Sequence, residues 1–415
     1  MLYSRRKAIG TCMKLLGAAC LSPIIRPRPA AAGQLLGPKD LVYQGAFRLP
    51  DGPDEIAWQW SGGGLTVNPA GNHGAGSLFG FGHAWNYYVS EVSIPAPVIS
   101  KRKKPQDLPT ARTIQKFADI SGRPGRPGQS YDLKVGGLEY CVTPVGDEAG
   151  KLHFAWGIHS DYHRVPTHGW ADTNLAAPRT AGLWHVGNHF NSHISTNDYL
   201  FTIDPAWAAA HTPGMLLATG RYREGGLVGE GPTLYAYGPW NQGNPPRPGT
   251  VIQDVTLLRY GEFGSGKSMN GYRHSDEWSG GAWLSQGSRA AVVFVGTKAL
   301  GKAWYGYRDG TTHESCQPNC PDSLGPRGWW ASSTQAQIIF FNPRDLAAVA
   351  AGRKAPHEPQ PFAVLDLTPY LFRQGAANDL SRLGAAAFDR VRSVLYVMER
   401  RADDDKPVIH VWRIT

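Results

Sequence analysis

Histidine is concentrated in one stretch of the chain. Seven of the 14 histidines lie between residues 153 and 193. The two tightest groups are His159 and His163, with Asp161 and Tyr162 between them, and then His185, His189 and His193. A neutral imidazole accepts a proton near neutral pH and also binds late transition metals. The stretch is therefore a candidate for acid–base catalysis or metal binding, while an ordinary role in Asn- and Gly-rich loops stays open.

The spacing within this stretch leads to specific roles. A period of four residues returns to the same face of a strand, so His185, His189 and His193 are expected to line one surface, where they could bind a metal. In β-elimination a base removes the proton beside a carboxylate and an acid assists the leaving oxygen. We assign the base to His159 or His189 and the acid to Tyr162.

A second region combines aromatic rings with an arginine. Trp304, Tyr305 and Trp330 lie in Gly-rich or polar segments, where flat rings can stack on the apolar faces of sugars. Arg327 is expected to neutralise a substrate carboxylate. In the alternative interpretation, most of the 14 tryptophans fill the core, and Arg327 makes a loop ion pair with Asp322.

Three further patterns are weaker. Residues Gly261 to Ser268 match a phosphate-binding loop, but no helix is predicted after them, so we expect no nucleotide. The run from Lys101 to Lys104 lies in a proline-rich loop without a nucleic-acid motif, so we expect no nucleic acid either. Asp403 to Asp405 could form a calcium loop, but a solvated hairpin turn is favoured.

The excess of positive charge lies at the N-terminus. The chain of 415 residues has 42 Lys and Arg and 33 Asp and Glu, a net charge of +9. Residues 1–32 contain six basic and no acidic residues, so the remainder has 36 basic and 33 acidic side chains, a net charge of +3. The high net charge therefore indicates almost nothing about what the mature protein binds.

Residues 1–32 have the order of an export signal. A charged segment around Arg5 and Arg6 is followed by an apolar segment and then by Ala30 to Gly33. This resembles a bacterial twin-arginine signal peptide, which implies a periplasmic or secreted protein. Ala8 and Gly10 depart from that pattern, which leaves the general secretory route open. A lipid anchor at Cys20 is disfavoured because Leu16 is one place too far away, and no segment is apolar enough to span a membrane.

The remaining cysteines agree with export. Cys316 and Cys320 lie in a polar, turn-rich loop, and a small-loop disulfide is predicted for an oxidising compartment. Cys141 stands in an apolar run and is predicted to be a buried strand residue. Beyond this pair the cofactor content stays open between none, a structural calcium ion and a His-bound transition metal.

The elements that position these residues are predicted to be strands. After residue 40, short aromatic and β-branched runs alternate with turn residues, and only Pro205 to His211 and Pro343 to Ala351 favour helices. A strand that begins with glycine recurs at 63–67, 137–141, 231–235, 281–284 and 384–388. The starts lie about 50 to 100 residues apart, which indicates units of about four strands.

Such units resemble the blades of a β-propeller, in which small residues let the inner strands crowd the axis. We predict an all-β fold in which residues 33–415 form one propeller of five blades, with six or seven as alternatives and a pair of β-sandwiches as the competitor. The run from Leu41 to Leu49 is expected to close the ring as the missing strand of the last blade.

These features together predict an exported, monomeric, carbohydrate-active propeller. The favoured activity is polysaccharide lyase action on an acidic glycan, by analogy in architecture and residue types with propeller lyases. A glycoside hydrolase is the near alternative. A propeller that only binds a glycan or a protein, and a metal-dependent periplasmic oxidoreductase, are the two other hypotheses.

Overall fold

Runs of β-branched and aromatic residues between Gly-, Pro- and Asn-containing turns favour short pleated strands. The computed structural model describes residues 34–52, 57–84, 86, 88–121, 134–142, 150–157, 164–189, 191–223, 225, 229–238, 245–262, 264–373, 375, 377–380 and 382–415. Strands dominate this part of the chain, and they form five sheets. The predicted all-β fold and its five blades are confirmed.

Each sheet is one blade of a β-propeller. Blade one contains β2 (Leu65–Asn68), β3 (Ser77–Phe81), β4 (Tyr88–Ser93) and β5 (Thr113–Asp119). Blade two contains β6 (Lys134–Cys141), β7 (Lys151–Gly157), β8 (His168–Ala171), β9 (Thr180–Val186) and β13 (Val251–Ile252). Blade three contains β10 (Tyr199–Thr202), β11 (Leu217–Gly220), β12 (Leu234–Tyr237) and β14 (Asp254–Leu258). Blade four contains β15 (Glu277–Gln286), β16 (Arg289–Gly306), β17 (Gly328–Phe341) and β18 (Ala363–Asp366).

Blade five joins the two ends of the described chain. It contains β19 (Leu383–Asp389), β20 (Val394–Asp403), β21 (Lys406–Ile414) and β1 (Leu41–Arg48). The pairing of β1 with β21 is antiparallel and runs from Leu41 opposite Ile414 to Arg48 opposite Val408. The prediction that the early strand completes the last blade is therefore confirmed, and the closure leaves no free edge on β21.

Helices are short and lie in the connections. The α-helices are α1 (Pro205–His211), α2 (His313–Cys316) and α3 (Pro343–Ala350). The 3-10 helices are η1 (Pro38–Asp40), η3 (Asn72–Gly74), η4 (Pro105–Asp107), η5 (Ser192–Ile194), η7 (Asp322–Leu324) and η8 (Thr368–Tyr370). Asp204 accepts hydrogen bonds from the first-turn amides of α1, and Asn342 does the same for α3. Both predicted helices form, because each has a capping side chain followed by proline.

The innermost strands β2, β6, β10, β15 and β19 contact one another in a ring around the axis. Their approach is too close for ordinary side chains at some positions. A Cβ atom on Gly136 would lie 1.8 Å from the carbonyl oxygen of Asn197, and one on Gly280 would lie 2.7 Å from the backbone nitrogen of Ala386. Glycine at these positions therefore allows the blades to meet.

One predicted inner strand is wrong. The glycine-started run 231–235 belongs to β12, the third strand of blade three, and the innermost strand of that blade is β10, which begins at Tyr199. Room for the larger residues of β10 comes from β6, because a Cβ atom on Gly137 would lie 2.2 Å from the backbone nitrogen of Leu200. The small residues of one blade thus make space for large residues of the next.

The propeller has two faces, which we name by the ends of the innermost strands. Early residues of all five strands line one space at the axis, and later residues of β6, β10, β15 and β19 line a second space. The five innermost strands therefore run in the same direction. Because neighbouring strands within a blade are antiparallel, β7, β11 and β16 end at the N-terminal face, while β8, β12 and β17 begin there. β9 also ends at this face and β10 begins there, so His189 and His193, which lie between these strands, belong to the N-terminal face.

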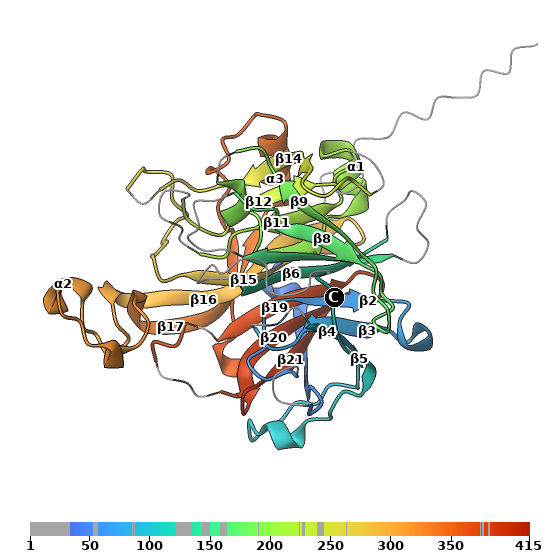
Figure 1. Ribbon diagram of the computed structural model, residues 1–415, viewed down its shortest axis with the longest axis horizontal. Helices are drawn as coiled ribbons and strands as arrows, with labels where there is room; N and C mark the ends of the chain where they lie inside the picture. Colours follow the sequence, from blue (N-terminus) through green and yellow to red (C-terminus); the bar gives the residue numbers. More distant parts are fainter. Residues whose placement is uncertain are drawn as a thin grey trace, which may run out of the picture. The chain divides into compact units, whose positions relative to one another are not determined.

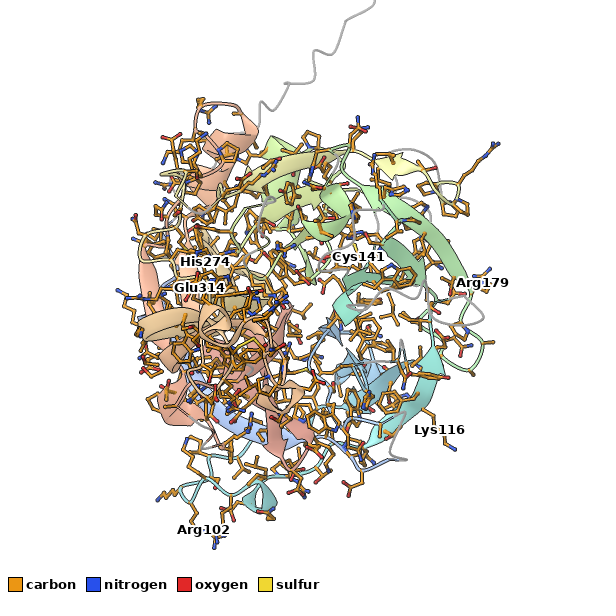
Figure 2. The ribbon with its side chains drawn as sticks, turned by 60° about the vertical axis from the view of Figure 1, so that its left-hand side comes forward. Arg102, Lys116, Cys141, Arg179, His274 and Glu314 are labelled. Carbon is orange, nitrogen blue, oxygen red and sulfur yellow. A yellow bond between two sulfur atoms is a disulfide. The ribbon has the colours of Figure 1, made fainter. Side chains whose placement is uncertain are left out.

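Blade four carries an extension. The β16–β17 hairpin continues past the length of the other strands and carries α2 at its tip (Figure 1). We call residues 298–334 the arm. Figure 2 shows Cys141 inside the fold, while Arg102, Lys116 and Arg179 point outward. The prediction for Cys141 is confirmed, since it is buried at the end of β6, and burial raises the pKa of its thiol to about 12.

Candidate functional site

Two histidines of the rich stretch belong to the interior of blade two. His153 on β7 and His168 on β8 are buried, and burial lowers the pKa of each to about 3. The ring of His168 lies 2.9 Å from the Thr167 hydroxyl through Nδ1 and 3.4 Å from the Thr219 hydroxyl through Nε2. These two side chains are neutral packing groups of the blade.

The predicted line of three histidines is not formed on one strand. His185 lies on β9, which ends at Val186, while His189 follows in a turn and His193 lies in η5. Among the described residues, these three do not form a cluster with donor atoms close enough to hold a metal ion together. The strand-face argument for a metal site therefore fails, because the backbone turns before the second histidine.

His189 has the properties of a neutral acceptor. Its ring centroid lies 5.9 Å from that of Tyr235, and its Nε2 atom is buried without a hydrogen-bond partner. Burial lowers the pKa of His189 to about 4, with further contributions from the positive charges of Arg259 and Arg164 and from His193. At neutral pH the imidazole is therefore uncharged and can accept a proton.

Tyr235 lies beside that imidazole. It lies on β12, it is fully buried, and its hydroxyl has no hydrogen-bond partner. Burial raises the pKa of Tyr235 to about 12, an effect that Asp254 strengthens and Arg259 opposes. The phenol is therefore a protonated donor at neutral pH.

Two guanidinium groups complete this set. Arg164 donates from Nη2 to the carbonyl of Gly187 at 2.6 Å, while its Nε is buried without a partner. Arg259 follows β14 and is anchored by its backbone nitrogen, which donates to the carbonyl of Pro356 at 2.9 Å. Within the described part of the chain, neither guanidinium forms an ion pair with a carboxylate. Asp254 is the carboxylate nearest in its effect: burial raises the pKa of Asp254 and the positive charge of Arg259 opposes that rise. An anion would therefore share the positive charge of this region with Asp254.

We call His189, Tyr235, Arg164 and Arg259 the inter-blade site. His189 and Arg164 lie between strands of blade two at the N-terminal face, whereas Tyr235 lies on β12 and Arg259 directly follows β14 of blade three. Sequence reasoning had singled out only His189. Tyr235 lies in a strand and Arg259 directly follows one, and both have the sequence surroundings of ordinary core or edge residues. Their positions in the sequence therefore do not indicate a functional role. Arg164 directly follows the predicted His159–His163 group and could have been found by its position.

The structure does not describe two of the predicted catalytic residues. His159 and Tyr162 fall in residues 158–163, outside the described part of the chain. Their described neighbour is Arg164, whose guanidinium is bound to Gly187 just before His189. The base and acid assigned to His159 and Tyr162 thus stay predictions.

A second group of arginines lies near the axis on the N-terminal face. A narrow hollow is lined by Arg373, Arg382 and Arg400 together with Asp379 and Glu399. Arg373 forms an ion pair with Asp379 at 2.7 Å, and Arg400 donates to the carbonyl of Gly62 at 3.3 Å. Its acidic and basic groups largely offset one another, so this hollow has a weaker claim to bind an anion than the inter-blade site.

A second Tyr–His set is buried in blade five. The Tyr43 hydroxyl lies 2.9 Å from Nδ1 of His410, and Nε2 of His410 lies 2.9 Å from Oε2 of Glu399. The same carboxylate accepts hydrogen bonds from the backbone nitrogens of Phe372 at 2.8 Å and Arg373 at 2.7 Å. Both ring nitrogens and both carboxylate oxygens are paired, so this set ties β1, β20 and β21 to the segment that carries Arg373.

The arm holds the predicted aromatic residues. Trp304 lies opposite Trp330 and Tyr305 opposite Trp329, so the pairs are on opposite faces of the hairpin. The indoles of Trp304 and Trp330 are fixed by backbone carbonyls of Tyr307 and Gly306 respectively. Tyr305 is the most open of the three predicted sugar-binding residues, with 39% of its surface exposed.

Arg327 lies on the arm and is not part of the inter-blade site. Its Nη1 atom is 2.8 Å from Nε2 of His313, and its guanidinium stands 5.7 Å from the centre of the Tyr305 ring. Trp329 stacks on His274 with ring centroids 4.1 Å apart. The residues that Arg327 contacts belong to blade four, whereas His189 follows a strand of blade two.

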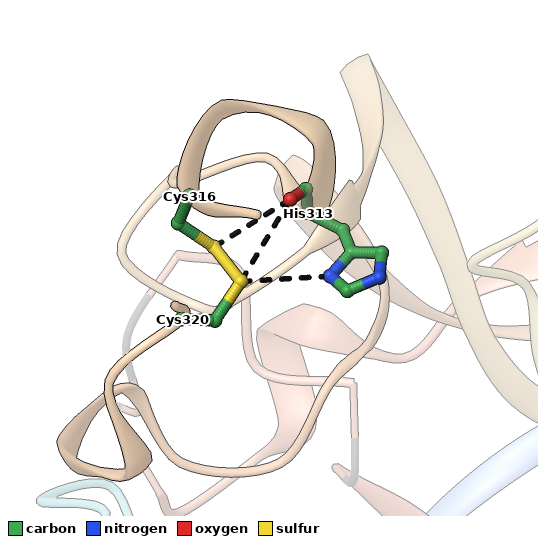
Figure 3. Close-up of side chains that lie close together, drawn as sticks. All are labelled: His313, Cys316 and Cys320. Atoms are coloured by element: carbon green, nitrogen blue, oxygen red, sulfur yellow. Dashed lines mark hydrogen bonds between the residues drawn. A yellow bond between two sulfur atoms is a disulfide. The ribbon is translucent and has the colours of Figure 1, made fainter. Parts of the chain in front are cut away.

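The predicted disulfide between Cys316 and Cys320 is present, with an S–S distance of 2.10 Å (Figure 3). His313 is its neighbour, with Nδ1 at 3.7 Å from the sulfur of Cys320. Because the two sulfurs are bonded to each other, they are not thiolate ligands, and we do not assign a metal to this loop.

Two weaker patterns are explained by local structure. No helix follows Gly261 to Ser268 before β15 among the described residues, so the geometry that a phosphate-binding loop needs is missing there. Asp403 is buried and pairs with Arg48 at 2.9 Å and Lys406 at 3.2 Å at the β20–β21 turn. The predicted hairpin turn is confirmed, with Asp404 and Asp405 exposed, but Asp403 is buried in ion pairs and is not solvated as predicted.

Comparison with models of known protein families and with the sequences of curated proteins finds no match. Within the described residues, no helix has the length and apolar character needed to cross a membrane. Any statement about function must therefore come from the chemistry of the sites themselves.

Proposed function

We propose that the protein is an exported, carbohydrate-active propeller that binds an acidic polysaccharide at the inter-blade site and cleaves it by β-elimination. The observation that carries the proposal is the set of one neutral imidazole, one protonated phenol and two guanidinium groups without carboxylate partners among the described residues. This set matches the needs of an elimination next to a carboxylate: a base, an acid and a counter-charge.

The reaction would proceed as follows at a uronic acid residue. Nε2 of His189 removes the proton from the carbon beside the carboxylate, and the electron pair of that C–H bond forms a carbon–carbon double bond. The glycosidic C–O bond breaks, and its electron pair leaves with the oxygen, which takes the proton of the Tyr235 hydroxyl. Arg164 or Arg259 stabilises the charge that develops on the carboxylate. The imidazolium and the phenolate then exchange the proton through solvent.

The electrostatics support these roles. A guanidinium beside His189 disfavours its imidazolium form, which keeps the base uncharged before the substrate binds. When a carboxylate binds, its negative charge offsets the guanidinium and makes His189 a stronger base. The raised pKa of Tyr235 suits an acid that protonates an alkoxide leaving group. We assign sugar contacts at the arm to Tyr305 on one face of the hairpin, and to Trp304 and Trp330 on the opposite face.

Export completes the proposal. The six basic residues of segment 1–32 and the order of its charged, apolar and small residues favour passage to the periplasm or outside the cell. The Cys316–Cys320 bond fits an oxidising compartment. The folded protein is expected to act as a monomer.

The test is incubation of the purified protein with a panel of uronic acid polymers, followed by ultraviolet absorbance of unsaturated sugar ends. We expect His189→Asn to lower the rate by about a hundredfold or more, the range typical of lost general acid–base catalysis. His73→Asn is the matched control, because His73 is exposed and its φ of 57° is one that asparagine tolerates. Absence of unsaturated products with every polymer would contradict the elimination.

A binding-only function is the second candidate, and the full burial of the Tyr235 hydroxyl favours it. In that case a carboxylated oligosaccharide would bind without being cleaved, and Arg259→Gln would weaken its binding while no products form with the wild-type protein. Calorimetric titration beside the absorbance assay separates the two functions. Metal analysis addresses the oxidoreductase hypothesis, which a protein without stoichiometric metal would contradict.

A further inference from the structure

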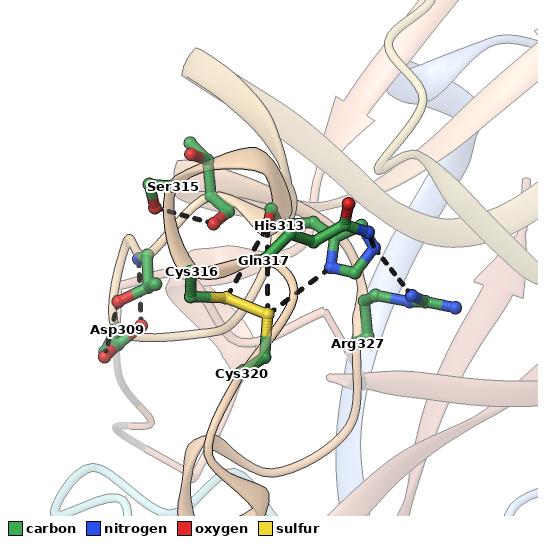
Figure 4. Close-up of a disulfide and its surroundings, with 9 residues drawn as sticks. Asp309, His313, Ser315, Cys316, Gln317, Cys320 and Arg327 are labelled. Atoms are coloured by element: carbon green, nitrogen blue, oxygen red, sulfur yellow. Dashed lines mark hydrogen bonds between the residues drawn. A yellow bond between two sulfur atoms is a disulfide. The ribbon is translucent and has the colours of Figure 1, made fainter.

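The disulfide at the tip of the arm lies in an environment built from His313 and Arg327. Cys316 ends α2, and Cys320 follows in the next turn, so both sulfurs stand in a short loop outside the blades (Figure 4). Both cysteines are half-buried, which leaves them open to a reactant from solvent. His313 begins α2 and directs its ring toward Cys320.

The hydrogen bonds of His313 determine which nitrogen carries its proton. Arg327 approaches Nε2 at 2.8 Å through Nη1, and the side-chain nitrogen of Gln317 also contacts Nε2. A guanidinium has only donors, so Nε2 must accept, and in the neutral ring the proton therefore resides on Nδ1. Nδ1 faces the sulfur of Cys320 at 3.7 Å. The N–H group is thus aimed at that sulfur.

Further contacts hold this arrangement in place. The ring of Tyr305 meets that of His313 edge-on at 5.9 Å, and the Arg327 guanidinium lies over the same Tyr305 ring at 5.7 Å. Glu314, on α2, is exposed, and Asp309 is bonded to the backbone and hydroxyl of Thr311. The groups that contact the His313 ring are therefore a cation, an amide and an aromatic ring, and none is an acid.

We propose that Cys316–Cys320 is a thiol–disulfide exchange site for a dithiol reductant, in which Cys320 is the leaving sulfur and His313 stabilises it. One thiolate of the reductant attacks the sulfur of Cys316 and forms a mixed disulfide. The Cys316–Cys320 bond breaks, and its electron pair goes to the sulfur of Cys320, which accepts a hydrogen bond from Nδ1–H of His313. The second thiolate of the reductant then attacks the mixed disulfide, releases Cys316 and becomes oxidised.

This arrangement distinguishes the two cysteines. A thiol that leaves as a stabilised anion leaves faster, and a hydrogen bond to the thiolate favours that anion. The backbone carbonyl of His313 lies near both sulfurs, at 3.5 Å from Cys316 and 3.8 Å from Cys320. The ring nitrogen Nδ1 is near Cys320 at 3.7 Å, so this ring contact is the feature that distinguishes the two cysteines. The exchange therefore has a direction, with attack at Cys316 and departure of Cys320. The inference does not depend on the proposed action on polysaccharides.

The first test compares the acidity of the two thiols. Cys316→Ser leaves Cys320 as a free thiol, Cys320→Ser leaves Cys316, and thiolate absorbance is followed against pH. We expect Cys320 to ionise below about 8.5, the ordinary value for a cysteine thiol, and Cys316 to ionise at or above it. Adding His313→Phe keeps an aromatic ring beside Tyr305 but removes the N–H group, and should return Cys320 to about 8.5. Equal ionisation of Cys320 with and without His313 would overturn the proposal.

The second test measures exchange in the full chain. We expect His313→Phe to slow reduction by dithiothreitol at pH 7 by about tenfold, since the leaving thiolate loses its donor. Arg327→Met should slow it to a smaller extent, because Nε2 is then free to carry the proton in place of Nδ1. His73→Asn, on blade one, is the control and should leave the rate unchanged. Thermal unfolding checks that each variant is folded, and unchanged rates in both arm variants would contradict the role of His313.

Discussion

The inter-blade site and the buried set in blade five use the same side chains to different ends. His189 and His410 each lie near a tyrosine, yet both ring nitrogens of His410 are paired whereas Nε2 of His189 has no partner. Tyr43 shares its hydroxyl with His410, while the hydroxyl of Tyr235 is unpaired. A polar group that is buried and satisfied stabilises the fold, whereas one that is buried and unsatisfied costs free energy unless a ligand pairs with it.

The difference therefore teaches how to separate structural from functional histidines. Residue type does not do so, and neither does burial, since His153 and His168 are more deeply buried than His189. His185 also has a ring nitrogen without a partner, but the charge of Arg164 alone among the arginines acts on it. What distinguishes His189 is an unpaired Nε2 atom together with the charges of both Arg164 and Arg259. A buried polar atom without a hydrogen-bond partner lowers the stability of the fold, and a site with such atoms is a candidate for ligand binding.

The largest expected effect is on stability. His410→Phe keeps the ring volume but leaves Glu399 and Tyr43 without their shared partner, so we expect the free energy of unfolding to fall by about 3 kcal/mol. His189→Phe is the matched change and should cost less than about 1 kcal/mol, because no hydrogen bond of Nε2 is lost. Urea unfolding measures the free energy of unfolding of both variants. Equal decreases in the two variants would contradict the distinction between the two sites.

The next effect is on binding and on pH dependence. Arg259→Gln should weaken the binding of a carboxylated oligosaccharide by about tenfold, a cost of about 1.4 kcal/mol. His189 acts as a base only while it is neutral, so activity is lost as the pH falls through its pKa of about 4, instead of through the ordinary 6.5.

Removing the charge of Arg259 also removes a cause of that lowered pKa, so the acid limb of kcat/KM should move to higher pH in Arg259→Gln. The rate profile against pH is the measurement. Arg353→Gln, in the turn after α3, is a control that changes the net charge equally. An identical shift of the acid limb in both variants would mean that the net charge of the protein, and not the inter-blade site, determines the pH at which activity is lost.

The smallest effect compares two hydroxyl groups. Tyr43→Phe removes a hydrogen bond to His410 and should lower the free energy of unfolding by about 1 kcal/mol. Tyr235→Phe removes an unpaired hydroxyl and should leave stability within about 0.5 kcal/mol of the wild type, while it abolishes cleavage. Chemical denaturation resolves the pair, and a larger loss for Tyr235→Phe than for Tyr43→Phe would reverse the distinction drawn between the two sets.

Much of the fold could be predicted because its signals are local. Glycine at the start of β6, β15 and β19 and just before β2 indicates inner strands, since only small residues fit where blades meet. Blade three escaped this reasoning because β10 begins with Tyr199 and Leu200, which use the space left by Gly137 of blade two. Leu200 fits beside the axis because of Gly137, which lies 63 positions earlier in the chain. The residues around Leu200 therefore do not indicate that it belongs to an innermost strand.

The sequence by itself determined where the charge lies, how the ring closes and which cysteines pair. The net charge of +9 divides into six on segment 1–32 and three on the rest, and Cys316 and Cys320 are close enough along the chain to pair within one loop. Only the tertiary structure decided the surroundings of His189, because the ring of Tyr235 and the charge of Arg259, which both act on His189, belong to a different blade. Whether a polar atom has a hydrogen-bond partner depends on all the groups around it. Around His189, these groups come from two blades and are brought together only by folding.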